Sequence, residues 1–238
     1  MRTDKDVIVA LDFPDAVKTF EFLKKFESSS RKPFVKIGME LFYSEGPEIV
    51  KKIKEHGHKI FLDLKLHDIP NTVRGGMKSL RSLGVDMVNL HAAGGIDMMK
   101  AAVEGLSGGE TKPLLIAVTQ LTSISQEKMN NELLISGSVD EVVAHYAKNA
   151  KAAGLDGVVC SPLEAQKIHA EIGKDFYTVT PGIRFSENDT GDQARVTDPL
   201  KARELGSDYI VIGRPVTQAE NPVSVYERCV KEFCEGVK

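Results

Sequence analysis

Three charged residues that could act together, Asp63, Lys65 and Asp68, lie close to one another in the segment FLDLKLHDIPNT (61–72). Alternation along a strand places Asp63 and Lys65 on one face and the intervening leucines on the other. A lysine held between carboxylates stays protonated, because opposite charges raise its pKa. A carboxylate beside an anionic substrate also destabilises that substrate until it loses its charge. The pattern therefore predicts a fixed proton donor suited to a carbanion-like centre left when carbon dioxide departs.

A second group of residues could bind a phosphate. The segments TPGIR (180–184) and VIGRP (211–215) each follow an apolar run with a glycine and an arginine, which include Arg184, Gly213 and Arg214. Glycine lets backbone N–H groups approach an anion, and the arginine fork binds phosphate oxygens in pairs. The polar stretch that follows, about residues 183–194, is long enough to close over a bound phosphate as a lid.

The elements that must position these residues are eight apolar runs rich in β-branched side chains, separated by segments with helical spacing. The first five runs begin about 27 residues apart, which is the length of one βα unit. Eight such units in 238 residues predict a (β/α)8 TIM barrel, a single α/β domain over residues 1–238. The predicted strands cover residues 7–12, 34–39, 59–66, 87–93, 113–121, 157–161, 177–183 and 209–215.

A doubly wound open sheet is the alternative fold. Such a sheet usually carries a glycine-rich turn after its first strand, whereas here that strand ends in Asp12-Phe13-Pro14. In a barrel, the reactive groups lie where the strands end. Polar residues close most of the runs, and Lys36, Asp63 and Lys65 interrupt them with charge, which costs several kcal/mol unless the charge is paired.

Composition excludes several classes of function. The chain has 31 Lys+Arg against 34 Asp+Glu, a net charge of −3, which argues against a nucleic-acid partner. No apolar run approaches the roughly 20 residues of a membrane span. Three cysteines without a CxxC pair, and an N-terminus unlike a signal peptide, predict a cytoplasmic protein. His56 and His58 precede the third strand, at the opposite end of the barrel, and are interpreted as solvated loop residues rather than metal ligands.

The segment at 61–72 resembles the DxKxxD signature of the orotidine 5′-phosphate decarboxylase family, of the bacterial single-function type. The resemblance extends along the whole chain, through segments that each match the family pattern: ALD (10–12), VKIG (35–38), NLHAAGG (89–95), QLTS (120–123), TPGIR (180–184) and VIGRP (211–215). It implies conversion of orotidine 5′-phosphate to UMP and carbon dioxide, the last step of de novo UMP synthesis, with no metal and no organic cofactor.

The resemblance also implies a role for each matching residue. Lys65 would protonate C6 of the pyrimidine, with Asp63 against the substrate carboxylate and Lys36 completing the catalytic charges. Asp68 and Thr72 would reach the site of a neighbouring subunit, which makes the enzyme a homodimer. The other implied substrate contacts lie at the ribose, the pyrimidine and the phosphate: Asp12, Lys36, Thr122, Ser123, Pro181, Arg184, Gln193, Gly213 and Arg214.

Two other functions fit parts of the pattern. A metal-dependent sugar-phosphate decarboxylase shares DxKxxD, but that family resembles this chain less at the second strand, where a glutamate ligand would stand in place of Lys36. A cation at that position repels a divalent metal. A non-catalytic sugar-phosphate or nucleotide sensor would need the phosphate site. It would gain nothing from an Asp–Lys–Asp array that opposes an anionic ligand.

Overall fold

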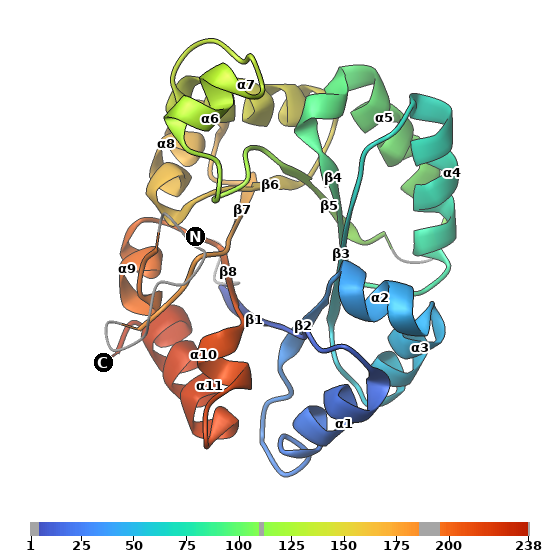
Figure 1. Ribbon diagram of the computed structural model, residues 1–238, viewed down its shortest axis with the longest axis vertical. Coiled ribbons are helices and arrows are strands. Elements are labelled where there is room, and N and C mark those ends of the chain that lie inside the picture. Colours follow the sequence, from blue (N-terminus) through green and yellow to red (C-terminus); the bar gives the residue numbers. More distant parts are fainter. Residues whose placement is uncertain (1–4, 110–111, 186–195, 238) are drawn as a thin grey trace.

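The computed structural model describes residues 5–109, 112–185 and 196–237. Eight parallel strands pair in chain order, and β1 also pairs with β8, so the sheet closes on itself (Figure 1). This closure confirms the TIM barrel and excludes the open sheet. The strands are β1 (Asp6–Ala10), β2 (Phe34–Ile37), β3 (Ile60–Leu66), β4 (Met87–His91), β5 (Leu114–Val118), β6 (Gly157–Val159), β7 (Tyr177–Thr180) and β8 (Tyr209–Ile212).

The helices form a ring outside the strands (Figure 1). They are α1 (Ala16–Lys24), α2 (Met39–Glu45), α3 (Glu48–Glu55), α4 (Pro70–Arg81), α5 (Gly95–Leu106), α6 (Gln126–Asn131), α7 (Val139–Ala152), α8 (Pro162–Ile172), α9 (Pro199–Glu204), α10 (Arg214–Thr217) and α11 (Pro222–Val230), with short turns η1 (Ala92–Gly94) and η2 (Lys231–Glu235). Over the described ranges, no helix is both long and apolar enough to cross a lipid bilayer.

Most predicted strands extend two or three residues beyond the observed ones at their carboxyl ends. β1 ends at Ala10 rather than residue 12, and β5 ends at Val118 rather than residue 121. The apolar pattern continues beyond the ends of the strands because the first loop residues still pack over the barrel. Leu11, for example, is fully buried although it lies outside β1. Asp12 and the residues after Val118 therefore lie in the βα loops, where barrel enzymes keep their reactive groups.

Alternation along the strands divides the buried side chains into two sets. Outward residues such as Val7 and Val9 pack in the large core under the helices, whereas Ile8 and Ala10 fill the barrel interior. The interior cluster also contains Phe34, Phe61, Met87, Ile116, Val179, Tyr209 and Val211. Two residues further along β2, β3 and β4, the same inward alternation presents Lys36, Asp63 and Asn89. The interior is thus apolar below and polar toward the carboxyl ends of the strands.

At the amino ends of the strands, the same hydrogen-bonding arrangement of an aspartate occurs three times. Asp86, Asp156 and Asp208 each precede an even-numbered strand and accept a hydrogen bond from the backbone N–H near the start of the preceding strand, at 2.7, 2.8 and 2.8 Å. Each aspartate also donates its own backbone N–H to the carbonyl of that same residue. The carboxylate therefore satisfies an N–H donor at the edge of the ladder, where no further strand residue is available.

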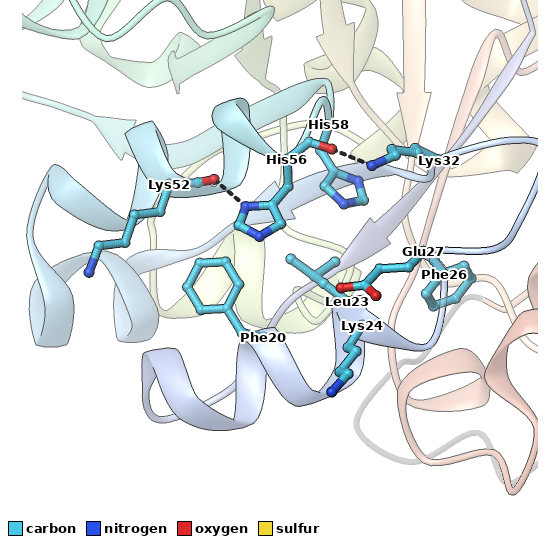
Figure 2. Close-up of a pocket in the computed structure, with 9 residues that line it drawn as sticks. All are labelled: Phe20, Leu23, Lys24, Phe26, Glu27, Lys32, Lys52, His56 and His58. Atoms are coloured by element: carbon cyan, nitrogen blue, oxygen red, sulfur yellow. Dashed lines mark hydrogen bonds between the residues drawn. The ribbon is translucent and has the colours of Figure 1, made fainter.

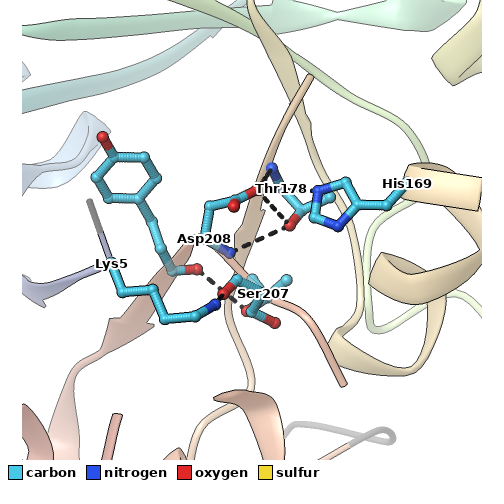
Figure 3. A network of polar contacts seen from close by, with 7 residues as sticks. Lys5, His169, Thr178, Ser207 and Asp208 are labelled. Atoms are coloured by element: carbon cyan, nitrogen blue, oxygen red, sulfur yellow. Dashed lines mark hydrogen bonds and ion pairs between the residues drawn. The ribbon is translucent and has the colours of Figure 1, made fainter. Parts of the chain in front are cut away.

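The third of these aspartates, Asp208, contacts Thr178 and His169 through its carboxylate (Figure 3). Asp208 Oδ2 accepts hydrogen bonds from the backbone N–H of Thr178 at 2.8 Å and from its hydroxyl at 3.0 Å, and lies 3.1 Å from His169 Nε2. Burial alone would raise the pKa of Asp208, but the bonds from His169 and Thr178 outweigh burial and hold the pKa below its usual value. Lys5 donates to the carbonyl of the neighbouring Ser207.

Candidate active site

The carboxyl ends of β2 and β3 bring together the charges that the sequence pattern singled out. Asp63 Oδ1 lies 2.7 Å from Lys65 Nζ, and Asp63 Oδ2 lies 3.3 Å from Lys36 Nζ. Lys36 Nζ also lies 3.0 Å from Asp12 Oδ1, in the loop after β1. The four side chains form one chain of alternating charge in the order Asp12, Lys36, Asp63 and Lys65.

Burial differs sharply along this network. The side chains of Asp63 and Lys36 are 9% and 11% exposed, whereas those of Lys65 and Asp12 are 25% and 61% exposed. The inner ion pair therefore supports two outer groups that can reach a ligand at the mouth. This arrangement places a lysine ammonium, a potential proton donor, at the accessible end of a fixed charge array.

Asp63 and Lys36, the inner pair of the network, stay ionised although they are buried. Burial would raise the pKa of Asp63, but the charges of Lys36 and Lys65 and hydrogen bonds from Lys65 and Asn89 bring it below its usual value. Burial would lower the pKa of Lys36, and Asp63 and Asp12 more than compensate, so that its pKa is raised. Both groups are thus ionised across the neutral range.

Glycine at position 38 provides space beside the ion pair of Lys36 and Asp12, and its backbone conformation is one that other residues also adopt. A Cβ at Gly38 would lie 3.1 Å from Lys36 Nζ and 3.2 Å from Asp12 Oδ1. Any larger residue would therefore press on the ion pair between these two side chains. The glycine of the VKIG segment leaves room for Lys36 to reach Asp12.

Asn89 is the site residue to which the sequence assigned no role. It lies in β4 with 1% of its surface exposed, and it donates from Nδ2 to Asp63 Oδ1 at 2.6 Å. Its Oδ1 accepts the backbone N–H of Lys65 at 2.8 Å. A polar residue within an apolar run, two positions before His91, was the available signal. His91 itself is half-buried, and burial, His67 and Lys65 lower its pKa.

Asp68 and Thr72 do not join the network within the described chain. Both side chains are exposed, Asp68 before α4 and Thr72 in its first turn. The Asp68 carboxylate accepts the N–H of Ile69 at 2.7 Å and forms no ion pair with Lys65 among the described residues. The expectation that Lys65 lies between two carboxylates is therefore met by only one of them, Asp63, within a single chain.

The residues expected at the phosphate follow β7 and β8. Arg184 is half-buried, and its Nη1 donates to the carbonyl of Ile183 at 2.7 Å; Arg214 is exposed. Gly213 adjoins the charge network, since a Cβ there would lie 3.9 Å from Asp12 Oδ2. The chain turns helical directly after Gly213, so that α10 begins at Arg214 and precedes α11.

The remaining expected contacts occupy the same end of the barrel or fall outside the description. Thr122 is buried and Ser123 exposed in the loop after β5, and Pro181 is half-buried directly after β7. Gln193 and residues 186–194 of the expected lid lie outside the described residues. The described ends of that loop pair with each other, since Arg184 N–H donates to the Thr197 carbonyl at 3.0 Å.

A pocket of about 350 Å³ between α1 and α3 contains none of the expected site residues (Figure 2). Its histidines each bond a backbone carbonyl, His56 Nδ1 to Lys52 at 2.8 Å and His58 Nδ1 to Pro33 at 2.9 Å. The amines of Lys24 and Lys52 point away from the two rings (Figure 2). His58 is only 4% exposed, so the interpretation of both histidines as solvated was wrong for this one. Among the described residues, no group of three or more His, Cys, Asp or Glu could hold a metal.

Comparison with known proteins identifies the family. The model described as Orotidine 5′-phosphate decarboxylase / HUMPS family matches residues 5–229. The chain belongs to this family. A protein of Bacillus cytotoxicus named orotidine 5′-phosphate decarboxylase is 58% identical over 237 residues, which cover 98% of each chain. A protein of Bacillus cereus with the same name is 57% identical over the same length and the same share of each chain.

Solved structures agree with this membership of the orotidine 5′-phosphate decarboxylase family. The crystal structure of orotidine 5′-phosphate decarboxylase from Lactobacillus acidophilus has a TM-score of 0.86 at 46% identity and covers 97% of this chain and 99% of its own. An uncharacterized conserved protein from Geobacillus kaustophilus has a TM-score of 0.84 at 50% identity, over 95% and 99% of the two chains. These findings confirm the resemblance drawn from the sequence.

Proposed function

We propose that this protein decarboxylates orotidine 5′-phosphate to UMP and carbon dioxide, in the last step of de novo UMP synthesis. The observation that carries the proposal is the Lys36–Asp63–Lys65 network, with ion-pair distances of 3.3 and 2.7 Å, at the mouth of a barrel of this family. Near relatives bear the name of that carboxy-lyase.

The proposed mechanism is a direct decarboxylation without metal or organic cofactor. The bond between C6 and the carboxylate breaks, carbon dioxide leaves, and the electron pair remains at C6. Lys65 Nζ then gives its proton to C6 and becomes a neutral amine. Asp63, held ionised by two lysines, would lie against the substrate carboxylate, so that loss of carbon dioxide removes a repulsion between like charges.

The other residues would bind parts of the substrate remote from the reacting bond. Asp12 and Lys36 would contact the ribose, while Thr122, Ser123 and Pro181 would line the pyrimidine. For the phosphate we propose Arg184, Gln193, Gly213 and Arg214. Binding energy at the phosphate lowers the barrier when it orders the charged network in the transition state.

We further propose a homodimer in which Asp68 and Thr72 complete the neighbouring site. Both are exposed and absent from the network of their own chain, and Ile69 between them is 67% exposed, which fits an apolar contact with a partner. Because one site would use Lys65 of one chain and Asp68 of the other, mixing inactive Lys65→Ala and Asp68→Ala proteins should restore about a quarter of wild-type activity after subunit exchange. No recovery despite demonstrated exchange would contradict the shared site.

The decisive test of the activity is the fall in orotidylate ultraviolet absorbance on addition of purified protein, with and without EDTA. We expect turnover in both conditions. Loss of turnover with EDTA would favour a metal-dependent decarboxylase, while tight binding without turnover would favour a sensor. We also propose a cytoplasmic location and no nucleic-acid or membrane partner. Cys160, Cys229 and Cys234 form no disulfide among the described residues, which is typical of a reducing compartment.

A further inference from the structure

The strand that carries Asp63 and Lys65 is irregular where it passes Asn89. β3 and β4 are in register at Phe61 with Met87 and at Leu62 with Val88, and the next pair joins Leu66 with Leu90. Three residues of β3, from Asp63 to Lys65, therefore lie opposite the single residue Asn89. This segment is a bulge, a device that proteins use beside active sites to redirect a side chain.

Lys65 has the strained backbone of this bulge. Its φ is 51°, in the left-handed region that costs a non-glycine residue about 1 kcal/mol. The ladder is interrupted here, so the Lys65 N–H needs another acceptor. The Asn89 side-chain oxygen takes that place at 2.8 Å. Strain of this kind persists only where surrounding contacts fix it.

The other end of the same amide faces the Asp63 carboxylate. Asn89 Nδ2 lies 2.6 Å from Asp63 Oδ1, the oxygen that also accepts from Lys65 Nζ at 2.7 Å. Asparagine suits both tasks because its side chain carries a separate donor and acceptor on one planar group. Aspartate lacks the donor when ionised, and alanine lacks both. The residue is 1% exposed, so the amide has little freedom to turn away.

From this geometry we infer that Asn89 is a positioning residue: its amide fixes the Asp63 carboxylate and the Lys65 backbone together, so that the proton donor and its carboxylate meet the substrate in one arrangement. The inference rests on the proposed decarboxylation, whose charged groups it positions. The groups that face Asp63 are Lys36 from β2, Lys65 from β3 itself, and Asn89 from β4, with Asp12 behind Lys36 and His91 further along β4.

Two variants of Asn89 separate positioning from simple packing. Asn89→Ala removes both bonds, and we expect kcat to fall by about 100-fold with KM changed much less, because small displacements of reacting groups cost rates of that order. Loss of the bond to Asp63 also raises the pKa of that carboxyl, so the acid limb of the pH profile moves to higher pH. Activity of this variant therefore declines sooner as the pH is lowered.

Asn89→Asp has the opposite expected pH response. The new carboxylate keeps an acceptor for the Lys65 N–H but faces Asp63 as a second anion. A proton shared between the two carboxylates restores the missing donor. We expect weak activity at neutral pH that increases as the pH is lowered, until Asp63 itself is protonated.

Thr178→Val provides the matched control. Thr178 is also fully buried and also donates to an aspartate, Asp208, at 3.0 Å, but at the other end of the barrel. The Thr178→Val substitution should lower the free energy of unfolding and leave the acid limb of the pH profile of kcat unshifted. For every variant, circular dichroism and UMP binding report the fold and the intact binding site.

The outcomes separate this inference from the proposed function. Wild-type kcat and an unshifted acid limb in folded Asn89→Ala would overturn the positioning role, as would an Asn89→Asp profile parallel to that of Thr178→Val. Failure of both Asn89 variants to fold would assign the residue a purely structural role and also contradict the inference. Absence of orotidylate turnover in the wild-type protein would instead overturn the proposed function.

Discussion

Two aspartates at opposite ends of the barrel, the buried Asp63 and the half-buried Asp208, keep a lowered pKa through different partners. Burial would raise the pKa of each, and partners hold both below the usual value. At Asp63 the compensation comes mainly from two lysine charges. At Asp208 it comes mainly from hydrogen bonds donated by His169 and Thr178.

The partners determine what each carboxylate can do. The bonds of Asp208 close the edge of the sheet, and the same device recurs at Asp86 and Asp156, so its role is structural. The network of Asp63 continues outward to Lys65, whose side chain is 25% exposed and can meet a ligand. The carboxylate of Asp208 stabilises the fold because its partners belong to the edge of the sheet and to a neighbouring helix, whereas that of Asp63 can prepare a reaction because its partners lead to the mouth of the barrel.

The largest effect is expected at Lys65, at the carboxyl ends of the strands. Lys65→Ala removes the proposed proton donor, and we expect kcat for orotidylate decarboxylation to fall by about 10⁴-fold, the upper range for general acid catalysis. Its free energy of unfolding should change little, because Asp63 keeps Lys36 and Asn89 as partners. Single-turnover rates and urea unfolding measure the two quantities. UMP binding should remain measurable, and retained turnover would rule out Lys65 as the donor.

The next largest effect is expected at Asp208, at the amino ends of the strands. Asp208→Ala leaves the buried Thr178 N–H and hydroxyl and the His169 ring without their carboxylate, which should lower the free energy of unfolding by about 3 kcal/mol. The kcat should stay within about twofold of wild type, because the mouth is unchanged. Urea unfolding and the decarboxylation assay measure this pair of values. A large fall in kcat in the folded variant would show that the two ends are coupled.

A smaller effect concerns the phosphate end of the mouth. Arg214→Ala should lower kcat/KM for orotidine 5′-phosphate by about 2 kcal/mol or more, through loss of a charge-assisted contact. Activity on orotidine, which lacks the phosphate, should not change. An equal loss on both substrates would show that Arg214 acts on the network near Asp12 rather than on the phosphate.

The fold and the charged part of the site were predictable for a common reason. Apolar runs at a regular period identify strands without knowledge of their neighbours, and a charge such as Lys36 within such a run is too costly to be accidental. Asp63 and Lys65 were found in the same way. In each case the signal lies within one segment of the chain.

The remaining features depend on contacts between segments. The bulge at Lys65 exists only relative to β4, so a period-two rule for an isolated strand does not show it. Asn89 carries no charge, and its role appears only when both of its partners are placed. Asp86, Asp156 and Asp208 precede their strands in segments that look like ordinary turns, and each bonds a strand begun about 25 to 40 residues earlier.

The smallest expected effect is the pH dependence of the stability that Asp208 contributes. Because the pKa of Asp208 is below its usual 3.8 in the folded protein, its stabilisation is complete above that value and is lost as the pH falls through the folded pKa. The difference in free energy of unfolding between wild type and Asp208→Ala should therefore be constant near pH 5 and shrink below about pH 3.8. Urea unfolding at successive pH values measures it. A difference that persists undiminished in acid would mean that packing, rather than the ionised carboxylate, carries the contribution of Asp208, and the likeness to Asp63 would then be one of position alone.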